Sequence, residues 1–233
     1  MATYRTVLNR VLKALSEDEI GSGVSELTES YHKLLGLFIN QFKELVEDQH
    51  NWRALRDTES VTVSAAAYTG TFTNANERSR ILRVYDERCG EERALVFDVT
   101  DANNPYRLRE MDISEMLRRR TLDTSNGNDP TFFAMDMSSG TPTLQVWPTP
   151  TDERTISVTL ITPQAELADD ALDTTILVPA RPIEIGATWY ALEERGEELG
   201  VNGLFNQEMF DQTLGSYVAR DAEEQGGYNL VPV

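Results

Sequence analysis

The chain has 233 residues, a formal net charge of −18 at pH 7 and a single cysteine, Cys89. This length allows one large domain or two smaller ones with a substantial core. The acidity argues against a general basic surface for phosphate backbones, and one cysteine excludes an intramolecular disulfide and a cysteine-based zinc cluster. The first residues lack the apolar core of a signal peptide, and no apolar run approaches the ~20 residues that span a membrane. We therefore expect a soluble protein made inside the cell, with no membrane partner.

Two helices are predicted at the N-terminal end. Apolar residues three or four positions apart predict a first helix over residues 3–15, with Thr3 as its cap. After an exposed acidic turn at residues 16–23, a long helix is predicted to begin at Ser25 and to reach about Asn51, roughly 27 residues or ~40 Å. Its apolar face consists of Leu27, Tyr31, Leu34, Leu35, Phe38, Phe42, Leu45 and Val46. Because this face must be buried, we expect the long helix to be the spine of the fold.

The pattern changes from helical to alternating at Thr58 and stays so over roughly the next hundred residues. Residues 68–71 are predicted to form a turn, and a reciprocal capping pair of Asp112 and Glu115 predicts a short helix over about 113–119. Alternation predicts strands near 61–65 and at 81–85, 94–99, 106–111, 131–135, 143–147 and 154–161. Short strands at this spacing predict an antiparallel sandwich or a small barrel.

The helical pattern returns at the C-terminal end. Beyond an acidic connection at residues 168–178, a helix is predicted to begin near Pro182. Gly200 and Gly203 are expected to mark its break, and a last helix is predicted over about 206–224.

This order of elements predicts an α+β fold in which a helical bundle is built jointly by both ends of the chain. We expect residues 1–57 and 164–225 to form the helical body. Residues 58–163 are expected to form the inserted antiparallel β-sandwich or barrel module, and residues 226–233 an extended C-terminal tail.

No set of residues points to catalysis or to a cofactor. His32 and His50 lie on one predicted helix five turns apart, ~27 Å, so they cannot share a metal ion. Cys89 stands beside acidic residues, a setting that disfavours a reactive thiolate. The sequence contains no phosphate-binding glycine loop, no G-x-S-x-G elbow and no H-E-x-x-H motif. Counting carboxylates does not exclude an acid pair of the glycosidase type, but solvated charge explains most of them. We expect no enzyme, no metal and no cofactor.

One basic run stands out against the acidic background, namely Arg118, Arg119 and Arg120. It can be the solvated end of the short predicted helix, where the helix dipole favours cations. It can also be a clamp on an acidic surface of a neighbouring subunit, or a DNA contact.

Three stretches taken together resemble the head-to-tail adaptor proteins of tailed bacteriophages, the connector or tail-tubular A-like proteins. The first, LLGLFINQFKELVEDQHNWRALRDTESVTV, combines a long helix, a Trp-bearing turn and a first strand. The second, LQVWPTPTDERTISVTLITP, is similar to their Trp-Pro strand, turn and final strand. The third, IGATWYALEERGEELG with FNQEMFDQTLGSYVARDAEEQ, is similar to their closing helix pair. The resemblance covers nearly the whole chain, while residues 87–131 match only in general character.

The resemblance implies a structural virion protein of the neck or tail, assembled in the host cytoplasm, and no enzyme. Such adaptors form a ring, usually of twelve copies, below the portal protein. They extend the DNA channel and dock the tail or nozzle, and duplex DNA passes without specific binding. The resemblance also implies that the C-terminal segment docks into the portal, through Tyr228, Asn229, Leu230, Val231, Pro232 and Val233. The alternative for this apolar segment is that it folds back on its own subunit.

A second class of function stays open at this point. It is a carbohydrate-binding or carbohydrate-degrading module of a phage tail appendage, because β-rich virion parts often have that role. A row of exposed aromatic residues along the strands would favour this alternative, whereas a ring-sized native particle would favour the adaptor.

Overall fold

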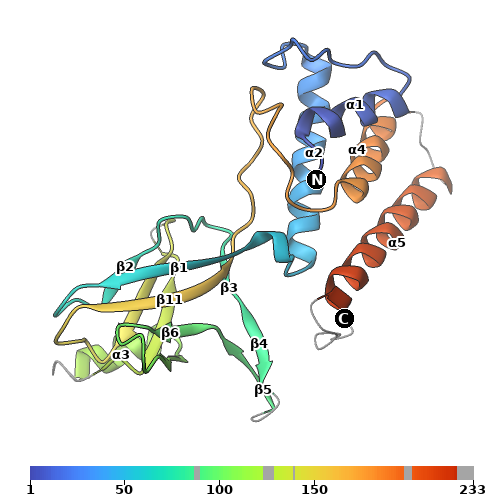
Figure 1. Cartoon of the computed structure of the whole chain (residues 1–233). Helices are drawn as coiled ribbons and strands as arrows, with labels where there is room; N and C mark the ends of the chain where they lie inside the picture. The colour runs from blue at the N-terminus through green and yellow to red at the C-terminus, as the bar shows by residue number, and fades with distance from the viewer. Residues whose placement is uncertain (87–89, 123–128, 139, 197–200, 225–233) are drawn as a thin grey trace. The chain divides into compact units, whose positions relative to one another are not determined.

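The protein is described here by a computed structural model, which covers residues 1–86, 90–122, 129–138, 140–196 and 201–224. The chain divides into two compact units (Figure 1). The helical unit comprises residues 1–54 and 164–233, and the β unit comprises residues 55–163. The predicted α+β class is confirmed, since the N-terminal helices pack on the C-terminal helices and antiparallel sheets are inserted between them in sequence.

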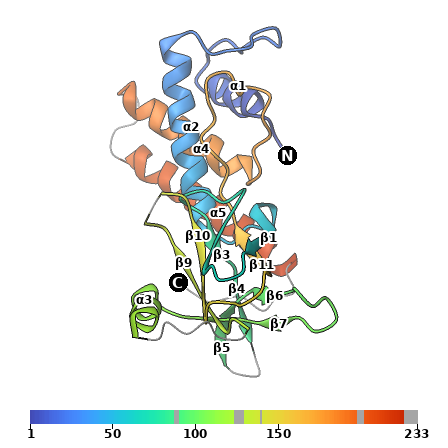
Figure 2. The same ribbon diagram turned by 90° about the vertical axis from the view of Figure 1, so that its left-hand side faces the viewer.

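The described part of the helical unit contains the α-helices α1 (Tyr4–Ala14), α2 (Ser30–Gln49), α4 (Ala180–Glu194) and α5 (Val201–Glu224). Helix α4 contacts α1, α2 and α5; it lies next to α2 in Figure 1 and crosses it at an angle in Figure 2. The Phe42 ring of α2 lies at the centre of this packing, with its centroid 4.7 Å from that of Tyr190 and 5.2 Å from that of Phe210. Helices from both ends of the chain therefore share one core.

Helix α1 matches its prediction closely. Thr3 is the N-cap, and its side-chain oxygen accepts a hydrogen bond from the Thr6 N–H, which satisfies one of the unpaired donors of the first turn. Tyr4, Leu8 and Val11 are buried as the apolar pattern indicates.

Helix α2 begins later than predicted. It starts at Ser30 and has 20 residues, with Glu29 in place of Ser25 as its N-cap residue. Leu27 is buried but lies before the helix, because its N–H donates to the carbonyl of Asp169. A partner far along the chain thus holds this segment outside the helix. Leu45, predicted on the buried face, is 42 % exposed.

Three polar residues of α2 are buried, and together they bind the backbone of residues 164–167, where the chain returns from the β unit. The Asn40 amide exchanges two hydrogen bonds of 2.9 Å with the backbone of Leu167. The Lys43 ammonium donates to the carbonyls of Gln164 and Ala165 at 2.8 and 3.0 Å. The Glu47 carboxylate accepts from the Gln164 N–H at 3.2 Å. This polar contact explains why the buried face of α2 is not purely apolar.

The predicted break between the last two helices is tested only at Gly203, because Gly200 lies outside the described residues. Gly196 adopts a φ of +72°, a conformation that glycine adopts without strain, and it follows the end of α4. Helix α5 already begins at Val201, so Gly203 lies inside a helix and does not mark a break. A single glycine costs a helix only about 1 kcal/mol, which a helix of 24 residues can offset.

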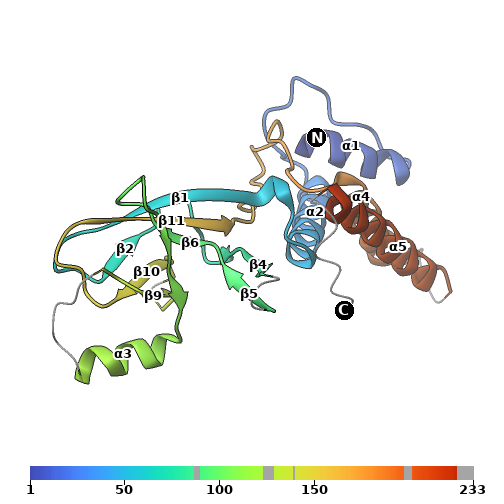
Figure 3. The same cartoon turned by 60° about the horizontal axis from the view of Figure 1, so that its bottom comes forward.

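The described residues of the β unit form three sheets. The first has the order β1-β11-β6-β7, with β3 also paired to β11; the second has the order β2-β10-β9-β8; and β4 pairs with β5. The strands are β1 (Arg56–Val63), β2 (Thr69–Thr71), β3 (Arg80–Ile81), β4 (Arg83–Asp86), β5 (Glu91–Ala94), β6 (Val96–Asp98), β7 (Tyr106–Arg107), β8 (Arg109–Glu110), β9 (Phe132–Asp136), β10 (Thr143–Trp147) and β11 (Arg154–Ile161). All the pairs are antiparallel except β8 with β9. Figure 3 shows β1 and β11 side by side over their whole length.

One hydrophobic core lies between the two larger sheets, as in a sandwich. Val61, Val96 and Val158 come from the first sheet, and Phe133 and Leu144 come from the second. Strands β10 and β11 have the predicted bounds.

Three predicted strands are each divided in two, at Leu82, Leu95 and Leu108. At these positions the chain passes from one pairing partner to the next; the Leu108 N–H, for example, still donates to the Val96 carbonyl of β6, the partner of β7, whereas β8 beyond it pairs with β9. The strands therefore bend from one sheet toward another.

Residues 68–71 were predicted to form a turn, but Thr69–Thr71 is strand β2, paired with β10. Gly70 has no room for a side chain, because a Cβ there would overlap the Val61 side chain. The glycine thus marks close approach of two strands and not a turn.

Helix α3 (Ile113–Leu122) extends three residues beyond its prediction. The Asp112 carboxylate accepts from the Ser114 N–H at 2.8 Å and caps the helix start. Glu115 does not complete the predicted reciprocal pair; its carboxylate binds Arg118 and Arg119.

Candidate functional site

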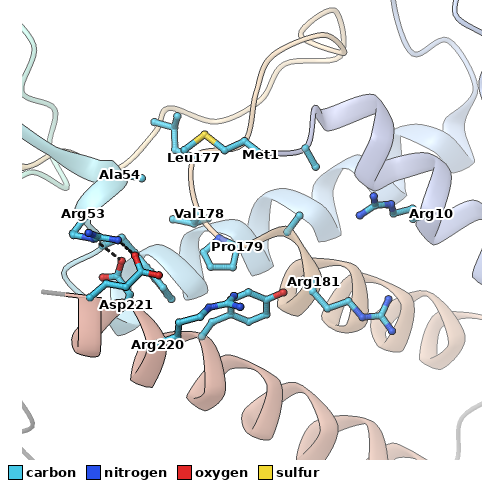
Figure 4. A pocket seen from close by; sticks show the side chains of 15 residues that line it. Met1, Arg10, Arg53, Ala54, Leu177, Val178, Pro179, Arg181, Arg220 and Asp221 are labelled. Atoms are coloured by element: carbon cyan, nitrogen blue, oxygen red, sulfur yellow. Dashed lines mark hydrogen bonds and ion pairs between the residues drawn. The ribbon is translucent and has the colours of Figure 1, made fainter. Parts of the chain in front are cut away.

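A groove of about 760 Å³ opens on the helical unit, where residues from both ends of the chain meet (Figure 4). Its apolar wall is formed by Met1 and by Leu177, Val178 and Pro179, the residues that lead into α4. Four arginines surround this wall: Arg10 from α1, Arg53 from the turn after α2, Arg181 from α4 and Arg220 from α5. Among the described residues, two carboxylates line the groove against these four arginines, so this lining is basic in a chain of net charge −18.

Two of these arginines share one buried carboxylate. Glu184 is 5 % exposed at its side chain, and its two oxygens accept from Arg10 at 2.6 Å and from Arg181 at 3.2 Å. The guanidinium-bearing side chains stay 57 % and 58 % exposed. Each guanidinium has five N–H donors, so both keep donors directed at the groove and at solvent. The three groups together carry one positive charge.

The other end of the groove is an ionic cluster between the turn after α2 and the last turn of α5. Asp221 accepts from His50 at 2.9 Å and from Arg53 at 3.4 Å, and Arg53 also pairs with Glu224. The Trp52 indole beneath it is buried and donates to the Val46 carbonyl at 2.7 Å. This cluster fixes the end of α5 to the end of α2.

Arg220 is exposed, and its guanidinium lies 4.5 Å from the centroid of the Tyr217 ring one turn earlier. Among the residues that the structure describes, it makes no ion pair. Its charge is therefore available to a ligand in the groove.

The predicted basic run lies on α3 in the β unit, and its three members have different surroundings. Arg118 is 59 % exposed and binds both oxygens of Glu115, at 2.7 and 2.8 Å. Arg119 also binds Glu115 and lies over the Trp147 ring. These hydrogen bonds from Arg118 and Arg119 lower the pKa of Glu115 to about 2.

Arg120 faces into the β unit. Its guanidinium donates to Gln145 at 2.6 Å and to the Val146 carbonyl at 3.1 Å, and it covers the Tyr68 ring at 3.9 Å. Burial lowers the pKa of this guanidinium. Of the three arginines, Arg118 has the most exposed side chain, and the other two serve largely internal contacts.

The other predicted residues are distributed as follows. Residues 226–233 and Cys89 lie outside the described residues. His50 belongs to the ionic cluster with Asp221, and His32 lies 3.7 Å from Glu29 at the start of α2. In the described part of the chain, no group of three or more His, Cys, Asp and Glu side chains could hold a metal ion. None of the helices described there is both long and apolar enough to cross a membrane.

The groove could not be predicted from the sequence, because its arginines stand singly at positions 10, 53, 181 and 220. No local motif unites them. The one available signal was their rarity, since the chain has 21 basic residues against 39 acidic ones.

The helical body is built from both ends of the chain, the β unit is inserted between them in sequence, and a groove lined by arginines opens on the helical body. The family model of the SU10 adaptor protein matches residues 2–231. The chain therefore belongs to the SU10 adaptor protein family, the phage head-to-tail adaptors. This membership implies a structural, non-catalytic role, and it confirms the resemblance recognised in the sequence. No curated protein gives a significant match.

Proposed function

We propose that this protein is the ring-forming adaptor of the virion neck, usually twelve copies below the portal. The family match over residues 2–231 is the observation that carries the proposal. Copies of the helical unit form the wall of a channel that continues the portal, and the next tail component or nozzle docks below. The protein is assembled into the virion in the host cytoplasm.

The charge of the chain supports passage of DNA without specific binding. A ring of subunits that each carry −18 presents an electronegative bore. At physiological salt the repulsion of phosphates is confined to a screening length of about 8 Å, so the bore disfavours capture without blocking entry. The isolated protein should show no submicromolar affinity for duplex DNA at physiological salt, which electrophoretic or fluorescence titration can measure.

The segment Tyr228–Val233 is the proposed portal anchor. Four of its six residues are Tyr, Leu or Val, which is too apolar for a solvated tail, and two glycines separate it from the preceding residues. Ordering such a segment costs about 1 kcal/mol or more per residue, so a single copy binds weakly. A ring of copies gains by multivalency, because the first segments to dock hold the others near their sites. Arg118, the most exposed of the three arginines on α3, is the proposed contact to a neighbouring subunit, and Arg119 shares its carboxylate partner Glu115.

The test uses portal-bearing heads that lack the tail. Purified protein is added, and cryo-electron microscopy of the portal vertex determines whether a ring forms and how many copies it has. Removal of residues 226–233 should leave the circular dichroism spectrum and thermal midpoint unchanged and should abolish stable attachment. A matched variant keeps the length but replaces Tyr228, Leu230, Val231 and Val233 by serine. This serine variant should also fail to attach stably to the heads if apolar contact drives docking. Wild-type occupancy by both variants would refute the anchor, and a vertex without any ring would refute the adaptor ring itself.

A further inference from the structure

Two surfaces of opposite charge lie at opposite ends of helix α2 in the helical unit. The basic groove includes Trp52 and Arg53, which follow the end of α2. At the start of α2, a hollow of about 340 Å³ is lined by the connection from α1, including Glu17, Asp18 and Glu19. Helix α2 has 20 residues and is ~30 Å long, so it separates the connection from the Trp52 and Arg53 end of the groove, while Arg10 at the other end of the groove belongs to α1. In Figure 1 the connection between α1 and α2 lies at the end of α2 remote from the last turn of α5.

The acidic connection is held in a fixed shape with its charges outward. The Asn9 side chain accepts from the Ile20 N–H at 2.9 Å and donates to the Ile20 carbonyl at 3.1 Å, and the Ile20 side chain is buried. Glu17 pairs with Arg195 at 2.5 Å. Asp18 and Glu19 are exposed and make no ion pair with any described residue. Because the backbone is already ordered, little conformational entropy is lost when a partner binds these carboxylates.

The basic groove offers guanidinium groups that can bind the carboxylates of an acidic connection. Arg220 lies over an aromatic ring without an ion pair in the described part of the chain, and Arg10 and Arg181 keep donors beyond those that hold Glu184. Guanidinium groups bind carboxylates through paired N–H donors. The groove is therefore complementary in charge to residues 16–19 of another copy.

We propose that the basic groove of one copy receives the acidic connection of the next, residues 16–29, and that Asp18 and Glu19 bind Arg220 and Arg181. The proposal rests on the ring function above and names the surfaces that meet in it. A second copy is the favoured occupant because each chain supplies one surface of each kind. Copies with a net charge of −18 repel one another, and a local contact of opposite charge offsets part of this repulsion. Such a head-to-tail contact joins two different surfaces, and it closes into a ring when the rotation between copies permits.

Charge reversal on each surface tests this contact. Arg220→Glu alters the groove without touching the Glu184 pairs, and Glu19→Arg alters the connection. Arg109→Glu is the control, because Arg109 is exposed and lies in the β unit. Sedimentation velocity and native mass spectrometry of the full chain, at rising concentration and two salt concentrations, measure self-association.

The wild type should associate more strongly at low salt, and each reversal should weaken association at least about tenfold, while the control matches the wild type. An equimolar mixture of the two reversed proteins should associate again, in alternation, because each reversed surface then finds an opposite charge. A chain that carries both reversals should also associate, because its altered groove meets the altered connection of another copy with opposite charge. A wild type that stays monomeric at every concentration in low salt overturns the proposal. So does association of the reversed proteins at wild-type strength, or a mixture that does not recover.

These outcomes differ from those for the ring itself. If Arg220→Glu still forms wild-type rings on portal-bearing heads, this contact is wrong and the adaptor function stands. If the wild type forms no ring on those heads, the adaptor ring is wrong whatever the free chains do.

Discussion

The Lys43 ammonium lies 3.4 Å from the Glu47 carboxylate one turn later on α2, and both side chains are fully buried. Each group also binds the backbone of residues 164–165, where the chain returns from the β unit. A buried ion pair stabilises a fold only when its remaining donors and acceptors are satisfied, and here backbone groups contribute to that. The pair therefore links the helices of the N-terminal end to those of the C-terminal end.

Replacement of Lys43 by methionine should destabilise the helical unit by about 3–5 kcal/mol, because it leaves Glu47 buried without its counter-charge. The double variant Lys43→Met, Glu47→Gln keeps an acceptor for the Gln164 N–H and removes the unpaired charge. It should lose clearly less stability than the sum of the two single variants. Urea denaturation of all four proteins measures the coupling. An additive double variant would contradict the pairing.

Two glycines on neighbouring helices form a matched pair for testing the helical core. A Cβ on Gly186 of α4 would overlap the Phe42 ring, so Gly186→Ala should cost about 1–3 kcal/mol by overpacking. A Cβ on Gly215 of α5 would have open space around it, and Gly215→Ala should be neutral or stabilising by up to about 1 kcal/mol. Thermal and urea denaturation compare the two. Equal effects would mean that α4 does not pack on α2 as closely as the structure has it.

The sequence predicts elements well where their signals are local. Thr3 predicts the start of α1 because the cap oxygen and the Thr6 N–H that donates to it are three residues apart, and the alternation of residues 154–161 predicts β11 because the whole pattern lies within that strand. The start of α2 could not be predicted, since the bond that holds Leu27 outside the helix comes from Asp169. The position of Gly70 inside a strand could not be predicted either, because the Val61 side chain that it lies against belongs to another strand.

The candidate site is harder to predict from the sequence than the fold is. A run such as Arg118 to Arg120 is conspicuous, but a run does not tell where each side chain points, and Arg120 faces into the β unit. The groove arginines carry no such pattern, because only the folded chain brings Arg10, Arg181 and Arg220 together. The family resemblance could be recognised from the sequence because it depends on the order of helices and strands along the chain. That order stays the same when the start of a helix or the position of a turn is predicted wrongly.

Tyr4 gives the helical unit a defined sensitivity to alkaline pH. Burial, reinforced by the carboxylates of Asp169 and Glu166, raises the pKa of the Tyr4 hydroxyl to about 12. Between about pH 10 and pH 12 the unfolded chain loses this proton while the folded chain keeps it, so the stability falls as the pH rises. The loss attributable to Tyr4 should reach about 2–3 kcal/mol near pH 12. Tyr4→Phe should fall less steeply with pH over this range, which urea denaturation at successive pH values can measure. Parallel curves for the two proteins would rule out the assignment.

Arg118 and Arg120 form a second matched pair, because they are neighbours in sequence with opposite surroundings. Arg120→Gln removes two hydrogen bonds to Gln145 and Val146 and the contact with the Tyr68 ring, so the β unit should lose about 1–3 kcal/mol. Arg118→Gln removes an exposed pair with Glu115 and should cost less than about 1 kcal/mol, decreasing with salt. If the proposed contact of Arg118 with a neighbouring subunit is right, this second variant should instead weaken ring formation on portal-bearing heads. Denaturation curves and ring occupancy, measured on the same preparations, separate the two roles. An Arg118 variant with reduced stability and unchanged occupancy would contradict the intersubunit contact.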